Sequence, residues 1–172
     1  MKKLVCFVLA AVLLLAVTFS AALYIQHSES GYSHTDWTVS ILMKENFKEK
    51  FGTDRVRRVS YDYDIKVSEN RETAEVTLNM EVFIGDSSYI ASAEGEIKAH
   101  SLPSGDVLWE GPIDGEILLG DKTVELTVGF AQVESSGDVS ISVTFSGIAC
   151  GFTFGDYIMK GEVLEFFKNR VS

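Results

Sequence analysis

Two carboxylates, Asp62 and Asp64, lie two positions apart in a stretch that alternates apolar and polar residues. At this spacing on a β-strand both side chains point to the same face, which is the geometry that general acid–base chemistry or a bound cation needs. The same spacing is also typical of the solvated face of an amphipathic strand. We expect the solvated face, and no catalytic residue, at these positions.

Several further carboxylates between residues 94 and 125 indicate an acidic surface. A calcium site needs many oxygen ligands at about 2.3–2.6 Å, and no loop carries carboxylates at that density. The histidines also lack the spacing of a zinc site. We therefore expect no metal and no cofactor, and a surface that serves solubility. The carboxylates are Glu94, Glu96, Glu110, Asp114, Glu116, Asp121 and Glu125, and the histidines are His27, His34 and His100.

The sequence also lacks the residue patterns of nucleophilic catalysis. No serine lies in a Gly-x-Ser-x-Gly turn, and the glycines at residues 147–155 come without the lysine of a phosphate-binding loop. Cys150 is the one cysteine after residue 25, so that part of the chain has no intramolecular disulfide, and its apolar neighbours predict a buried side chain. We expect no enzyme; the alternative is a hydrolase whose carboxylates converge only in the folded chain.

Basic residues gather just before the first long alternating stretch. Arg55, Arg57 and Arg58 follow the lysines of a predicted helix, and together these positions predict one basic patch. Such a patch could bind acidic phospholipid or the acidic face of another copy, or it could pair with the acidic face of its own chain. The lysines are Lys44, Lys48 and Lys50.

The tryptophans are the other candidates for contact with a partner. Large aromatic side chains dominate the binding energy of many interfaces, although they also fill cores. Trp37 lies at the start of the predicted helix, and Trp109 lies within a turn-flanked segment at residues 106–111. The candidate partner-binding residues are therefore Trp109, Arg55, Arg57 and Arg58.

The first 25 residues predict a membrane segment. Residues 4–25 carry no charge, and about 20 apolar residues suffice for a helix to cross a bilayer. Lys2 and Lys3 precede the run, and residues 26–43 contain no Lys or Arg, so we expect the rest of the chain outside the cytoplasm. Residues 1–25 are either an uncleaved anchor, because the run is long, or a signal peptide, because residues 20–22 fit a cleavage site. The predicted protein is thus membrane-anchored through residues 4–25 or secreted.

The charge of the chain limits its partners. All 25 acidic residues follow the apolar run, and the formal net charge of the chain is −10. A negative surface repels phosphate backbones, so we expect no nucleic acid partner. A protein partner outside the cytoplasm is the class that we expect instead.

The elements that must position these side chains begin with a tether and a helix. Residues 26–35 are polar and predict a short tether. Residues 37–51 predict an amphipathic helix, capped by Asp36 and ended by Gly52. Its apolar residues recur at intervals of four, which places them on one face. They are Val39, Met43, Phe47 and Phe51.

From residue 59 onward the apolar period changes to two, which predicts antiparallel strands with one wet face each. Residues 59–67 with 74–84, and residues 124–130 with 139–145, predict two strong hairpins. We expect a mainly β domain over residues 36–172, an antiparallel β-sandwich of seven to nine strands with the one N-terminal helix. The remaining strands are expected at residues 89–99, 107–110, 113–119, 148–154 and 163–167, with short edge strands at 107–119.

Three short segments resemble the LEA14 and FxLYD-type β-sandwich families. They are VTLNMEV at residues 76–82, PSGDVLW at residues 103–109 and VELTV at residues 124–128. The chain departs from the family pattern after the first long strand, where an Asn-Pro is replaced by Asn79 and Met80. The resemblance implies a sandwich fold and transfers no functional residue.

These observations favour a non-enzymatic binding or structural module at the cell exterior. Because loops carry most binding specificity on β scaffolds, we expect the partner contacts in three of them. These loops are residues 86–89, 103–106 and 135–138.

Overall fold

The computed structural model describes residues 26–34, 39–155 and 161–171. The predicted membrane segment at residues 4–25, and the predicted cap Asp36 and aromatic anchor Trp37, lie outside the described residues. Neither helix in the described part of the chain is long and apolar enough to span a bilayer.

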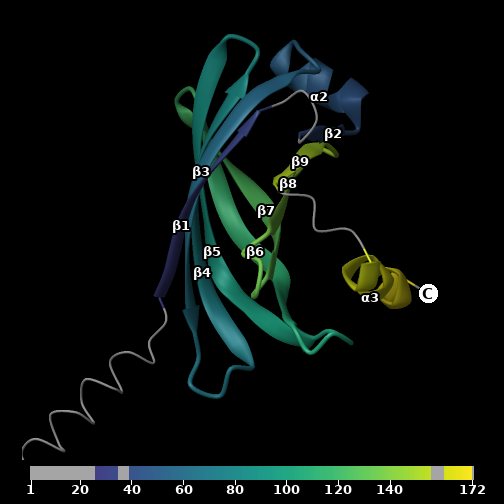
Figure 1. Cartoon of the computed structure of the whole chain (residues 1–172). Helices are drawn as coiled ribbons and strands as arrows, with labels where there is room; N and C mark the ends of the chain where they lie inside the picture. The colour runs from purple at the N-terminus through teal and green to yellow at the C-terminus, as the bar shows by residue number, and fades with distance from the viewer. Residues whose placement is uncertain (1–25, 35–38, 156–160, 172) are drawn as a thin grey trace, which may run out of the picture.

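In the described part of the chain, nine antiparallel strands form one continuous sheet, which curls into a half-barrel (Figure 1). Strands β3 to β9 follow one another in chain order, while β1 lies beside β3 and β2 lies beside β9. The fold is therefore mainly β, as predicted. The strands are β1 (Gln26–His34), β2 (Ser40–Leu42), β3 (Val56–Val67), β4 (Thr73–Ile84), β5 (Ser87–Ser101), β6 (Val107–Leu119), β7 (Lys122–Val133), β8 (Val139–Phe145) and β9 (Gly151–Gly155), and the helices are α2 (Lys44–Phe51) and α3 (Gly161–Val171).

The predicted sandwich is replaced by this single sheet, whose two halves pack against each other. The Tyr61 ring on β3 lies 5.2 Å from the Phe154 ring on β9, centroid to centroid. Tyr63 on β3 lies 5.5 Å from Phe130 on β7 in the same way. The concave face thus buries one apolar core between its own two halves, as two separate sheets would.

The bend that brings the halves together runs through β5 and β6. A Cβ atom at Gly95 would lie 3.0 Å from Cγ2 of Ile113, so only glycine leaves room on the concave side. The pairing of β5 with β6 is interrupted between Glu94↔Asp114 and Lys98↔Glu110, although the register is the same on both sides of the gap. The prediction of short edge strands at residues 107–119 is wrong: the segment is one long central strand, and its glycines permit the curvature.

The helices also differ from the prediction. Of the helix predicted at residues 37–51, the described residues 39–51 contain only Lys44–Phe51, because Ser40–Leu42 pair with β9 as a strand. Its end at Gly52, with φ of 72°, is as predicted. The strand predicted at residues 163–167 is wrong, since Gly161–Val171 is helical. Val163, Phe166 and Phe167 have helical spacing and pack on the outer face of the sheet near Leu108.

The residues 26–35 that we expected to form a tether contribute β1 to the sheet. Its register with β3 runs from Gln26↔Lys66 to His34↔Arg58. The segment is polar and has no apolar alternation, so its sequence does not indicate a strand. The two predicted strong hairpins are confirmed as β3–β4 and β7–β8, and Cys150 is buried as predicted.

Candidate functional site

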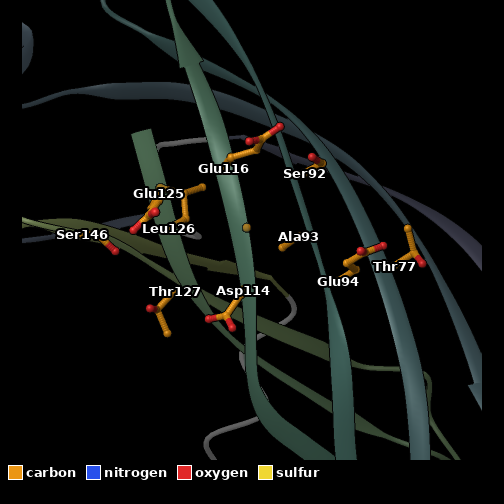
Figure 2. Close-up of a pocket in the computed structure, with 11 residues that line it drawn as sticks. Thr77, Ser92, Ala93, Glu94, Asp114, Glu116, Glu125, Leu126, Thr127 and Ser146 are labelled. Carbon is orange, nitrogen blue, oxygen red and sulfur yellow. The ribbon is translucent and has the colours of Figure 1, made fainter. Parts of the chain in front are cut away.

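The outer, convex face of the sheet contains a hollow of about 760 Å³ (Figure 2). Its carboxylates come from three neighbouring strands, because outward positions of β5, β6 and β7 alternate with buried ones. Between them lie Ala93 and Gly115, whose positions face the concave side, so the sheet itself forms the floor of the hollow. The carboxylates around the hollow are Glu94, Asp114, Glu116 and Glu125, and we call this surface the acidic face.

The register places carboxylates of the acidic face directly opposite one another. Glu94 of β5 pairs with Asp114 of β6, and Glu116 of β6 pairs with Glu125 of β7. Like charges at directly opposed positions destabilise a sheet. All four carboxylates are exposed, so their common field reaches the solvent over the hollow. The arrangement costs the folded chain free energy and attracts cations or cationic groups.

Neutralising one member of such a pair is expected to stabilise the fold. Glu116→Gln removes repulsion from Glu125 and should raise the free energy of unfolding by about 0.5 kcal/mol. Urea unfolding at low salt measures the gain, and added salt should shrink it because exposed charges are screened. Glu69→Gln, in an exposed turn, is the control and should change little. A loss of stability in Glu116→Gln would contradict the opposed-charge geometry.

The carboxylates are arranged along a face and do not surround a point. Among the described residues, no three His, Cys, Asp or Glu side chains are grouped so that they could hold a metal ion. The predicted pair Asp62 and Asp64 lies on β3, outside the hollow. The amide of Asn79 donates a hydrogen bond to Asp62, at 3.1 Å. Exposed carboxylates held side by side in this way attract cationic groups.

The basic residues gather at one end of the sheet, beside α2. Lys44 and Arg55 line one small recess of about 240 Å³ together with residues of β2. Arg57 donates to the carboxylate of Asp86 at 3.2 Å, and the Cζ atom of Arg58 lies 3.9 Å from the centroid of the Phe83 ring. Arg55 and Arg57 are exposed. We call this surface, with Lys48 and Lys50 of α2, the basic end.

Trp109 lies in the core and not at the surface. Its side chain is 1 % exposed, and its Nε1 atom donates to Oε2 of Glu134 at 3.3 Å. Of the two roles predicted for Trp109, the structure therefore agrees with core filling, since a partner cannot reach the buried ring. Glu134 also forms an ion pair with Arg71, so the turns around the tryptophan are tied together.

The three predicted binding loops lie at two ends of the sheet. Residues 103–106 and 135–138 meet, because Ser135 donates through its amide and its hydroxyl to Asp106. The hydrogen bond from the Ser135 side chain lowers the pKa of Asp106, so this contact stabilises the fold above the pKa of an unfolded aspartate and is lost as the pH falls through the lowered value. Residues 86–89 lie at the other end, beside Arg57, and the prediction of a loop there is wrong for Ser87–Tyr89, which belong to β5.

Sequence reasoning found the carboxylates of the acidic face but not their arrangement. The hollow depends on the register of three strands, which is not visible in the apolar alternation. Comparisons of the chain with family models, with curated proteins and with solved structures find no match. The geometry of the acidic face and of the basic end therefore carries the functional argument.

Proposed function

We propose that this chain is a non-enzymatic binding module, positioned outside the cytoplasm, whose acidic face binds a cationic protein partner. The observation that carries the proposal is the hollow on the convex face with exposed carboxylates from three adjacent strands around it. Their direct opposition costs stability that a partner with Lys or Arg side chains would return on binding. Such a surface selects partners by charge and raises their rate of association.

A hydrolase that uses the same carboxylates is less well supported. A carboxylic acid that donates a proton in catalysis is commonly held in an apolar pocket. The carboxylates of the acidic face are instead exposed, and the hollow is lined by other polar groups such as Ser92 and Thr127. An open, uniformly charged surface suits recognition of a partner better than proton transfer.

The location is part of the same proposal. Residues 4–25 form the apolar run, and β1 begins at Gln26, opposite Lys66 of β3. With the run as an anchor, this end of the sheet would face the membrane, and the basic end at the start of β3 would point away from it. The proposal also includes the resemblance of residues 76–82, 103–109 and 124–128 to the LEA14 and FxLYD-type sandwich families, although this chain has one curled sheet in place of two.

A binding measurement tests the function. We expect the full chain, in a non-ionic detergent at low salt, to bind a labelled oligolysine peptide as followed by fluorescence anisotropy. The variant Glu94→Gln/Glu116→Gln/Glu125→Gln should bind about tenfold more weakly, since three exposed charge contacts at about 0.5 kcal/mol each sum to roughly one decade. Added salt should weaken the wild-type interaction.

A matched variant distinguishes binding at the acidic face from an effect of the total charge of the chain. Glu49→Gln/Glu69→Gln/Glu165→Gln removes as many exposed carboxylates from α2, a turn and α3, away from the acidic face. It should bind the peptide nearly as well as the wild type. Equal weakening by both variants would show that only the total charge matters and would refute the acidic face as the site.

A further inference from the structure

The exposed large apolar side chains of the described residues fall into two pairs, one beside each charged surface. Ile90 and Leu118 are 60 % and 50 % exposed, and Leu42 and Met43 are 40 % and 63 % exposed. Scattered single apolar residues are common on protein surfaces, but adjacent pairs next to concentrated charge are typical of interfaces.

Ile90 and Leu118 lie at the margin of the acidic face. Ala91 pairs with Ile117 across β5 and β6, so Ile90 and Leu118 are neighbours on the opposite, outer side. Two positions further along the same strands, Ser92 pairs with Glu116 in the hollow. The acidic face thus continues into an apolar pair.

Leu42 and Met43 lie beside the basic end. Leu42 ends the edge strand β2, and Met43 precedes Lys44, the first residue of α2. Met43 has a left-handed backbone, with φ of 50° and ψ of 59°, which a residue other than glycine rarely adopts. Such strain is commonly kept where it serves function, and here it accompanies the most exposed of the four side chains.

Helix α2, which carries Lys44 of the basic end, packs on the side of the sheet opposite the acidic face. The Phe51 ring of α2 packs on the concave side, 6.0 Å from the Tyr89 ring and 5.2 Å from the Phe145 ring, between centroids. Ile90 follows Tyr89 on β5 and therefore points to the convex side. In Figure 1, α2 lies beside β2 and β9. A contact between Lys44 of α2 and the acidic face therefore requires two molecules.

We propose that a second copy of this chain is the partner: the basic end of one molecule binds the acidic face of another. The inference rests on the proposed function and names the occupant of its site. Lys44 and Arg55 meet the carboxylates of the acidic face, while the pair Leu42 and Met43 covers Ile90 and Leu118. Opposite charges around paired apolar centres provide both the steering and the desolvated contact that association needs.

Sedimentation velocity of the full chain in a non-ionic detergent tests this. The wild type should self-associate at low salt and dissociate as salt is added. A basic-end variant, Lys44→Glu/Arg55→Glu, and an acidic-face variant, Glu94→Lys/Glu116→Lys, should each raise the self-dissociation constant by at least about tenfold. Both variants keep residues 1–25, so association through the apolar run would not distinguish them from the wild type.

A mixture of the two variants gives the sharpest result. Each variant retains the surface that the other has lost, so an equimolar mixture should form a 1:1 complex that neither forms alone. Circular dichroism of each variant, compared with the wild type, establishes that both are folded. Self-association that survives in either variant, or a mixture that stays monomeric, would overturn the inference.

Two further outcomes separate this inference from the proposed function. A wild type that binds oligolysine but stays monomeric would leave the function standing and refute self-recognition. A wild type that binds neither would refute both. Flotation with lipid vesicles tests a membrane as the partner of the basic end. Stronger recruitment of the wild type to phosphatidylserine than to phosphatidylcholine vesicles, loss of that difference in Lys44→Glu/Arg55→Glu, and no self-association would assign the basic end to membranes and overturn the inference.

Discussion

Replacing Gly115 with alanine is expected to lower the free energy of unfolding by about 3 kcal/mol, although only one methyl group is added. A Cβ atom at this position would collide with the carbonyl oxygen of Ser92 and would lie 2.6 Å from Cβ and 2.9 Å from Cα of Ala93. The obstacles are backbone and a short side chain, which have no rotamer to move aside. Relief requires β5 and β6 to separate where Ala93 pairs with Gly115, at the bend of the sheet.

Gly129→Ala is the matched control for this change. Gly129 also lies in the interior of a long strand, β7, but the nearest atom to its added Cβ would be Cβ of Ser142, at an ordinary 3.7 Å. Its stability should stay within about 0.5 kcal/mol of the wild type. Urea unfolding of the full chain, followed by far-ultraviolet circular dichroism, measures both. Equal stability of the two variants would mean that the bend is looser than the structure shows.

The contrast between these glycines explains how much of the fold the sequence could predict. Strands β3, β4, β7 and β8 carry large apolar residues at every second position, so their existence and pairing follow from the pattern alone. Several inward positions of β5 and β6, on the concave side of the bend, carry alanine or glycine instead. These small residues weaken the alternating pattern, and the segment at residues 107–119 was therefore predicted as short edge strands.

The helices show the limit of local patterns in another way. Val39 and Met43 fit a helical row with Phe47 and Phe51, but pairing with β9 takes Ser40–Leu42 into the sheet. The helix then begins only after Met43 reverses the chain direction with its left-handed backbone. Long-range pairing overrides helical spacing here, and a single sequence carries no record of that competition.

The candidate site was predictable in composition but not in place. The basic residues were expected to form one patch, and Lys44 and Arg55 do line one recess. The carboxylates were recognised as an acidic surface, but which of them oppose one another depends on the register. A shift of one residue between β6 and β7 would remove the pairing of Glu116 with Glu125.

Trp109→Ala is expected to lower the free energy of unfolding by about 4 kcal/mol, because it empties a fully buried site in the core. The free energy of unfolding of a whole domain is about 5–15 kcal/mol, so the variant would lose much of its stability. The deletion also leaves Oε2 of Glu134 without the indole donor. Urea unfolding by circular dichroism at a fixed temperature measures the loss.

Trp109→Phe separates this structural role from the partner contact that the sequence suggested. Phenylalanine refills most of the volume and removes the hydrogen bond to Glu134, so it should cost about 1–2 kcal/mol. The variant stays folded, and its oligolysine binding and self-association should equal those of the wild type because the ring lies inside the curled sheet. If binding fell while stability held, the tryptophan would have to reach the surface, and the packing of β6 against the opposite half of the sheet would be wrong.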